Sequence, residues 1–128
     1  MNKKFIFLSF VFFYCLYATP VDWGSEQEIV LKKDEMVSAK VYANRSVKNF
    51  TMRWTLLKKD GIVVLLKYDD FPYQFILYLD YQRNRYDLLL DGSDNSRLVI
   101  LYKDFDFSSR NAKFWLGVQG QADFVLNR

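Results

Sequence analysis

The chain has 128 residues, with 18 Lys or Arg, 15 Asp or Glu, one Cys and no His. This length fits a single domain, and the lack of His excludes Ser-His-Asp catalysis and the usual His-containing zinc sites. The basic residues are scattered among acidic ones, whereas a nucleic-acid-binding surface needs concentrated positive charge. We therefore expect no nucleic-acid partner.

The first 18 residues have the pattern of a secretory signal peptide. Lys3 and Lys4 supply the positive start, residues 5–17 form an uncharged and mainly apolar run, and Ala18 is a small residue suited to cleavage. The run is shorter than the roughly 20 apolar residues of a membrane-spanning helix. We therefore expect a cleaved signal peptide over residues 1–18 and contact with a membrane only before cleavage.

Cleavage after Ala18 leaves 110 residues, 19–128, and lowers the net charge from +3 to +1 because both signal lysines are lost. Cys15 leaves with the signal, so the remaining domain has no cysteine and must be stabilised by core packing. Many small extracellular domains of animals depend on disulfides. A cysteine-free exported domain therefore indicates a bacterial cell envelope, and we expect a periplasmic location, with extracellular secretion as the alternative.

The strand pattern begins at Glu28, after which short apolar runs recur about every 10 to 12 residues between turn residues. In residues 50–58, apolar Phe50, Met52, Trp54 and Leu56 alternate with polar side chains. Residues 37–43 alternate in the same way, beginning with apolar Val37. A period of two predicts half-buried strands, since apolar residues of a helix recur every three or four positions.

Turn residues divide these runs into strands. Asp60-Gly61 predicts a hairpin from Phe50 to Tyr68, because Asp-Gly readily takes the positive φ that favoured hairpin turns require. Pro72 has no N–H to donate, so its segment is expected to be a loop or an edge strand. Further strands are expected at residues 73–80, 86–90, 98–103, 112–118 and 122–126.

Together the runs predict an all-β fold, because no segment has a sustained helical period. We expect a single antiparallel β-sandwich of about eight or nine strands, immunoglobulin-like or jelly-roll-like, over residues 28–128, preceded by a flexible segment at residues 19–27. A small open β-barrel is the alternative.

Three of the expected strands are apolar on both faces: residues 62–66, 75–79 and 98–102. A two-layer sandwich buries only one face of each sheet. The second face is covered either by another segment, a partner or a second copy, or by long Lys and Tyr side chains beside central strands.

Two adjacent acidic residues are mixed with aromatic ones around Pro72, and this loop is the main candidate for a binding site. Binding residues often lie on loops held by a rigid scaffold, although the aromatics of such a loop can also cap the core. Trp54 is expected in the core, whereas Trp115 follows Phe114 on the opposite strand face and is expected to be exposed. The candidate binding residues are Asp69, Asp70, Phe71, Tyr73 and Trp115.

A weak candidate for a calcium loop lies at Asp91, Asp94 and Asn95, because Ca²⁺ is bound by six to eight oxygens. The spacing does not match an EF-hand, and the same residue types are ordinary turn formers. We therefore expect no metal and no cofactor.

The sequence favours a non-enzymatic, exported binding or assembly module of the bacterial envelope. It would engage a protein partner, or a second copy in a homo-oligomer, through an apolar sheet face or an edge strand. One alternative is a carbohydrate-binding module that stacks sugars on Tyr and Trp rings, with a glycan as the ligand. The other is a hydrolase that depends on carboxylates alone.

Overall fold

The computed structural model describes residues 23–90 and 96–127. The predicted signal peptide and the calcium-loop candidates Asp91, Asp94 and Asn95 lie outside these residues. The described chain folds into nine β-strands: β1 (Trp23–Leu31), β2 (Val37–Ala43), β3 (Ser46–Lys58), β4 (Gly61–Tyr68), β5 (Phe71–Tyr78), β6 (Arg85–Leu89), β7 (Arg97–Asp106), β8 (Asn111–Gln119) and β9 (Ala122–Leu126).

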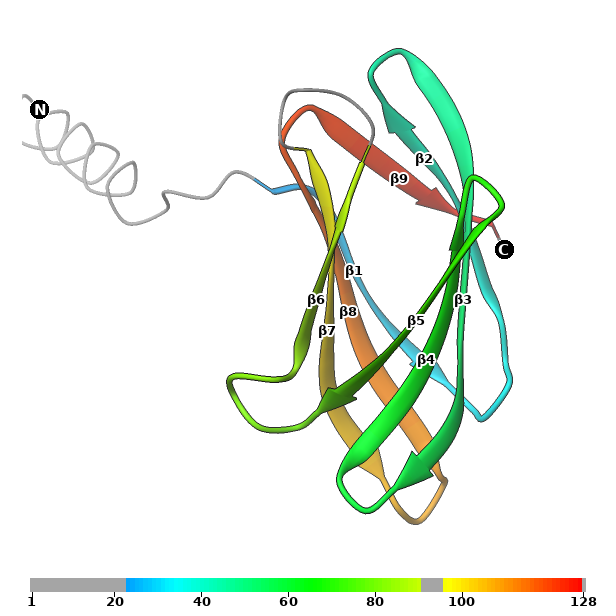
Figure 1. Ribbon diagram of the computed structural model, residues 1–128, viewed down its shortest axis with the longest axis vertical. Coiled ribbons are helices and arrows are strands. Elements are labelled where there is room, and N and C mark those ends of the chain that lie inside the picture. Colours follow the sequence, from blue (N-terminus) through cyan, green and yellow to red (C-terminus); the bar gives the residue numbers. More distant parts are fainter. Residues whose placement is uncertain (1–22, 91–95, 128) are drawn as a thin grey trace, which may run out of the picture.

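The strands form two antiparallel sheets that face each other (Figure 1). One sheet has four strands in the order β1-β8-β7-β6, and the other has five in the order β5-β4-β3-β2-β9. The prediction of a single all-β sandwich with about nine strands is confirmed. The strand order is that of two meanders, with β1 and β9 at the outer edges, and it differs from the ABED and CFG order of an immunoglobulin domain and from the paired Greek keys of a jelly roll.

The first strand begins earlier than the sequence indicated. β1 starts at Trp23 and pairs with β8 along its length, with Glu26 opposite Gly117, whereas the sequence pattern placed the start of the domain at Glu28. The first three pairs after Trp23 involve the polar residues Glu26, Gln27 and Glu28. Backbone pairing, which apolar periodicity does not report, therefore extends the sheet into a segment that we had expected to be flexible.

The predicted hairpin of β3 and β4 is present, but its turn differs from the expected one. Lys59 takes the positive φ, at 56°, and Gly61 pairs with Lys58 as the first residue of β4. Gly61 is needed there for another reason. A Cβ at this position would lie 3.0 Å from a methyl carbon of Ile76 and 3.0 Å from the ring of Tyr78, both on neighbouring β5.

A β-bulge in β3 overturns one core prediction. The register between β3 and β4 shifts between Trp54 and Leu56, and one additional residue reverses which side chains face inward. Leu56 is therefore 48% exposed, while Leu57 packs against the core in its place. The other predicted inward positions of this strand, including Phe50, are buried.

The core lies between the inner faces of the two sheets. Trp54 of β3 is only 1% exposed, and its indole N–H donates a hydrogen bond of 2.9 Å to the carbonyl oxygen of Leu31, at the end of β1. This buried bond joins the two sheets. The largest other fully buried side chains are Tyr102, Phe50, Phe114, Met52, Ile62 and Leu66.

The three strands that are apolar on both faces have different environments. β4 and β7 are interior strands of their sheets, and their outward apolar side chains are half-buried or buried, as the central-strand interpretation expects. β5 is an edge strand, and its outward Ile76 is 51% exposed. Only β5 among these three therefore presents a substantially exposed apolar surface. Among the described residues, the structure contains no helix with the length and apolarity that crossing a membrane requires.

Candidate functional site

The acidic pair of the predicted binding loop forms a tight turn between β4 and β5. Asp69 and Asp70 both have positive φ, at 53° and 65°, which is the geometry of a type I′ hairpin turn. Asp and Asn tolerate this conformation better than most residues other than Gly. The turn makes Tyr68 and Phe71 the closing pair of the hairpin and fixes the register of the strand that follows.

The register determines which backbone groups of β5 remain accessible at the edge of the sheet. Antiparallel pairs alternate between hydrogen-bonded and non-hydrogen-bonded. Because Phe71 closes the hairpin, the backbone groups of Pro72, Gln74, Ile76 and Tyr78 point away from β4. In agreement, the N–H of Tyr78 donates to the carbonyl oxygen of Arg83 at 2.9 Å instead of to β4. In the described part of the chain no strand pairs with this edge, so the stretch from Pro72 to Ile76 is open to a further strand.

Aromatic rings line the inward side of the same strand. Phe71 is 62% exposed, and its ring centroid lies 5.2 Å from that of half-buried Tyr73. Phe75 stacks on Tyr86 of β6 at 3.9 Å, with the rings 2° from parallel, and so links the two sheets. Leu77 is buried. Exposure therefore rises along β5 toward the Asp69-Asp70 turn, and we call the surface formed by residues 71–76 the β5 edge.

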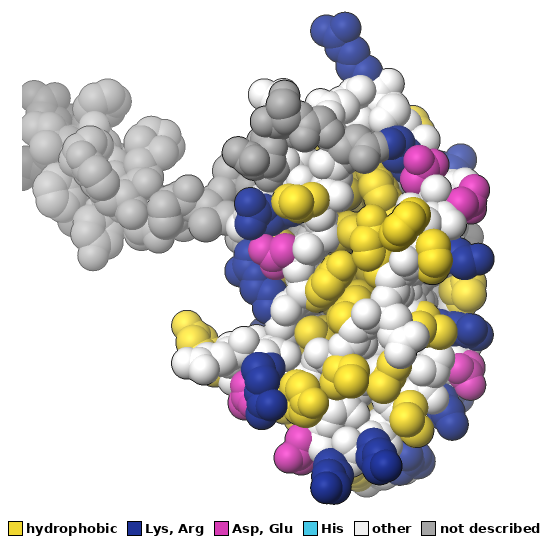
Figure 2. Space-filling view, in the orientation of Figure 1, with side chains coloured by type: hydrophobic (Ala, Val, Ile, Leu, Met, Phe, Trp, Pro, Cys, Tyr) yellow, Lys and Arg dark blue, Asp and Glu magenta, His cyan; other side chains and the backbone are white. Residues whose placement is uncertain are grey.

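The β5 edge crosses the front of the molecule in the view of Figure 1. Figure 2 shows hydrophobic side chains gathered in a band over this face, with charged side chains on both sides of it. Two tyrosines near the band have perturbed acidity. Burial, together with the charges of Asp69 and Tyr73, raises the pKa of Tyr68, and burial raises the pKa of Tyr86. Both phenols are therefore protonated at neutral pH.

The two turn carboxylates have different surroundings. Asp69 lies 3.7 Å from the ammonium group of Lys48, which is also 5.9 Å from the ring centroid of Tyr68. Asp70 is exposed and has no ion pair among the described residues. The turn therefore presents negative charge beside the exposed Phe71.

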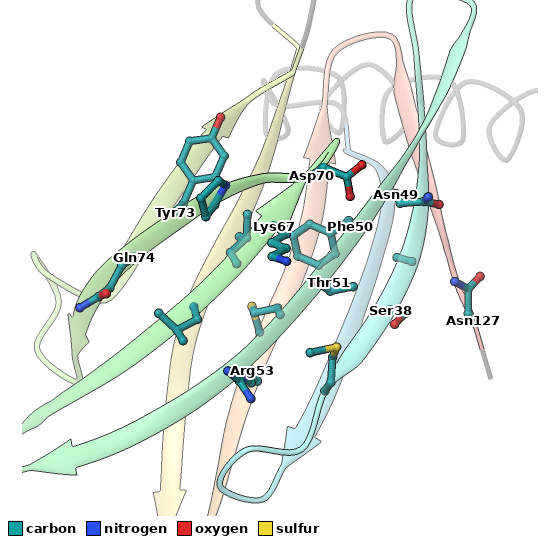
Figure 3. Close-up of a pocket in the computed structure, with 16 residues that line it drawn as sticks. Ser38, Asn49, Phe50, Thr51, Arg53, Lys67, Asp70, Tyr73, Gln74 and Asn127 are labelled. Carbon is teal, nitrogen blue, oxygen red and sulfur yellow. The ribbon is translucent and has the colours of Figure 1, made fainter.

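A second surface lies on the opposite, outward face of the five-stranded sheet. There the sheet is hollowed into a trough of about 800 Å³, which we call the outer trough (Figure 3). One row of outward positions crosses it from Pro72 through Lys67 and Thr51 to Ser38, and a parallel row includes Arg53. The remaining outward-facing and rim residues are Met36, Asn49, Leu65, Asp70, Gln74 and Asn127.

Trp115 lies on the other sheet, where it is partly covered by its own surroundings. As predicted, Trp115 occupies the outward face of β8, whereas its neighbour Phe114 is buried on the inward face. Trp115 is half-buried, so it is less exposed than expected. Its ring lies across Gly117, since a Cβ there would come within 2.2 Å of the ring. Val99, the register partner of Gly117 on the same face, is fully buried. The indole therefore acts as a cover for its sheet more than as a free platform.

An ion-pair network occupies the same outward face as Trp115. Asp87 accepts from Arg85 Nε at 2.6 Å and from Arg97 Nη1 at 3.2 Å. Burial opposes the ionisation of Asp87, but the hydrogen bonds and charges of the two arginines outweigh it and hold the pKa of the carboxyl below its usual range. Both arginines of this network are thus paired with an acid.

The structure separates the predicted site residues into two groups. Asp69, Asp70, Phe71 and Tyr73 lie together at the β4–β5 turn, whereas Trp115 is on the other sheet. The side chains of the outer trough were missed. Their polar alternation along β3 is visible in the sequence, but their meeting depends on the neighbouring strands. Within the described residues, no group of three or more His, Cys, Asp or Glu is arranged to hold a metal ion.

Neither a protein-family model, nor a curated protein, nor a solved structure matches this chain.

Proposed function

We propose that the protein is an exported binding module that takes up an extended segment of a partner protein along the β5 edge. The observation that supports this proposal is the combination, on one strand, of open backbone groups from Pro72 to Ile76 with the exposed rings of Phe71 and Tyr73. Export and a bacterial envelope location are part of the proposal and rest on the signal pattern of residues 1–18.

Strand addition uses the backbone for affinity and the side chains for selectivity. The N–H and C=O groups of Gln74 and Ile76 and the C=O of Pro72 pair with the incoming strand. Apolar side chains of that strand cover Phe71 and Tyr73, which removes aromatic surface from water. A Lys or Arg at the end nearest the turn meets the carboxylate of Asp70, which has no ion pair within the described chain.

The same strand limits pairing with a second copy. In an antiparallel pair of two β5 strands centred on Gln74, Pro72 of each copy faces Ile76 of the other. Since Pro72 has no N–H, the carbonyl of the facing Ile76 stays unpaired in both copies. Proline on an edge strand is a common protection against sheet-to-sheet association. A partner segment without proline at this position pairs more completely, which favours a different protein over self-association.

The test measures the binding of synthetic nine-residue peptides to the mature domain by fluorescence anisotropy. The peptides alternate Val and Thr and carry two Lys at one end, and the control peptide is identical except for a proline at its centre. Gln74→Pro removes the edge donor, whereas the matched Gln74→Ala keeps it. We expect Gln74→Pro and Phe71→Ala each to weaken binding about tenfold, on the basis of about 1.4 kcal/mol for a lost hydrogen bond or buried ring contact.

Gln74→Ala is expected to bind like the unchanged protein. Circular dichroism establishes that each variant is folded. The proposal fails if no lysine-bearing peptide binds more tightly than its proline control, or if Gln74→Pro and Gln74→Ala bind equally well.

A further inference from the structure

The outer trough is distinct from the aromatic side of the β5 edge, because Phe71 and Tyr73 lie on the inward face of the sheet, whereas Pro72 and Gln74 line the trough from the outward face. Tyr73 projects from β5 away from the trough, whereas Gln74, its neighbour, lines it (Figure 3). Likewise Phe50 is an inward, buried residue of β3. A ligand in the outer trough therefore does not need the aromatic rings that the proposed function uses.

The floor of the trough is low because its central residues are small. Thr51 lies between Lys67 on one side and Ser38 on the other in a single row across three strands. Figure 3 shows longer side chains around this row, with Asn49 and Asn127 at one side and Gln74 at the other. Short hydroxyl side chains in the centre and long polar ones around them leave the hollow of about 800 Å³.

Positive charge in the trough is not neutralised within the described chain. Lys67 and Arg53 have no ion pair among residues 23–90 and 96–127, and the one carboxylate lining the trough is Asp70, at its end. Arg83, Arg85 and Arg97, in contrast, each form an ion pair with an aspartate. Two cations against a single carboxylate leave the trough with net positive charge, which attracts an anionic ligand.

The remaining polar groups suit a ligand rich in hydroxyls. The amides of Asn49, Gln74 and Asn127 and the hydroxyls of Ser38 and Thr51 can each donate and accept hydrogen bonds. A single-stranded nucleic acid would need aromatic rings on which to stack its bases, and no ring projects outward from the row of positions that forms the floor. Strong protein contacts are usually centred on Trp, Tyr or Arg anchors within a dry patch. Half of the lining residues are polar or charged, and Arg53 is the single anchor of this kind that points outward from them.

We propose that the outer trough binds an acidic saccharide, a sugar or sugar chain that carries carboxylate or phosphate groups. Lys67 and Arg53 pair with its anionic groups, and the amide and hydroxyl side chains hydrogen-bond to its hydroxyls. Leu65 and Met36 provide apolar contact for the C–H faces of the sugar rings.

The experiment uses isothermal titration of the mature domain with hexagalacturonic acid, with glucose 6-phosphate, with a neutral galactose oligomer and with inorganic phosphate. Lys67→Gln and Arg53→Gln remove the trough cations. Lys103→Gln, on the other sheet, makes the same change of charge elsewhere and serves as the control. Thr51→Tyr fills the floor of the trough without removing a charge, and tyrosine is favourable in a strand.

We expect at least one acidic saccharide to bind more tightly than both the neutral oligomer and inorganic phosphate. Lys67→Gln, Arg53→Gln and Thr51→Tyr should each weaken that binding about tenfold, whereas Lys103→Gln should leave it unchanged. Comparison of hexagalacturonic acid with glucose 6-phosphate identifies whether the trough prefers a carboxylate or a phosphate group.

Three results overturn the proposal: equal binding of the neutral oligomer, equal binding of inorganic phosphate, or an equal loss in Lys103→Gln, which would indicate unspecific charge attraction. Phe71→Ala separates this proposal from the proposed function. It removes a ring of the β5 edge and should leave saccharide binding unchanged, while Lys67→Gln should leave peptide binding unchanged.

Discussion

Replacement of Trp54 by Phe tests the side-chain hydrogen bond that joins the two sheets. The indole N–H donates to the carbonyl oxygen of Leu31 at 2.9 Å, and the ring makes an edge contact with Phe105 at 5.7 Å between centroids. Phe keeps an aromatic ring in the core but has no donor. The carbonyl of Leu31 then loses its buried partner, while the rest of the strand pairing is unaffected.

The expected cost has two parts. A buried carbonyl left without its partner costs about 1–3 kcal/mol. The smaller ring also leaves a void of about 40 Å³, which at about 24 cal/mol per Å³ adds roughly 1 kcal/mol. We therefore expect Trp54→Phe to lower the free energy of unfolding by about 2–4 kcal/mol, a large share of the 5–15 kcal/mol typical of a single domain.

The assay is urea unfolding followed by circular dichroism, since the substitution alters the fluorescence of the protein. Trp115→Phe is the matched control, because it makes the same chemical change on an outward, half-buried side chain, where we expect a loss of about 1 kcal/mol or less. If Trp54→Phe costs no more than Trp115→Phe, the bond from Trp54 to Leu31 does not hold the sheets together as argued.

Three further predictions concern other parts of the chain. Gly117→Ala should displace the ring of Trp115, because the new Cβ would lie 2.2 Å from it; we expect a red shift of Trp emission and a loss of about 1–3 kcal/mol, and an unchanged spectrum would contradict this. Burial, with a contribution from Asp104, raises the pKa of Tyr102 to about 12. The stability that comes from burying the protonated phenol is therefore complete below pH 10 and disappears as the pH rises through 12. Between pH 9 and pH 11, the free energy of unfolding measured in urea should fall by about 1 kcal/mol less in Tyr102→Phe than in the unchanged protein. Equal decreases in the two proteins would refute the assignment. Expression of the full chain in a bacterial host should give a mature protein that begins at Thr19, measured by intact mass, and retention of residues 1–18 would contradict the signal-peptide prediction.

Strand positions could be predicted from the sequence because alternating apolar residues report directly which side of a strand is buried. This reasoning failed at Leu56, where a bulge shifts the alternation by one residue without any sign in composition. It also failed at Lys59, which takes the positive φ that the sequence assigned to the following Asp60-Gly61. Both differences arise because the pairing of whole strands overrides the preference of a single residue.

The candidate site was only partly predictable for a similar reason. Asp69 and Tyr73 are near each other in the chain, so their proximity follows from the turn itself. Lys67, Thr51 and Ser38 come from three strands, and they meet only because β4, β3 and β2 are neighbours in a particular register. A single sequence contains the polar residue types of such a surface but not the strand order that brings them together.

The most direct test of the central proposal is amide hydrogen exchange of the mature domain, measured residue by residue by NMR, with and without the lysine-bearing strand peptide. In the free protein, the N–H groups of Gln74 and Ile76 should exchange rapidly, while those of Tyr73 and Phe75, which bond to β4, should be protected. Addition of the peptide should then protect Gln74 and Ile76. Protection of Gln74 and Ile76 already in the free protein, or no change on addition of the peptide, would contradict strand addition at the β5 edge.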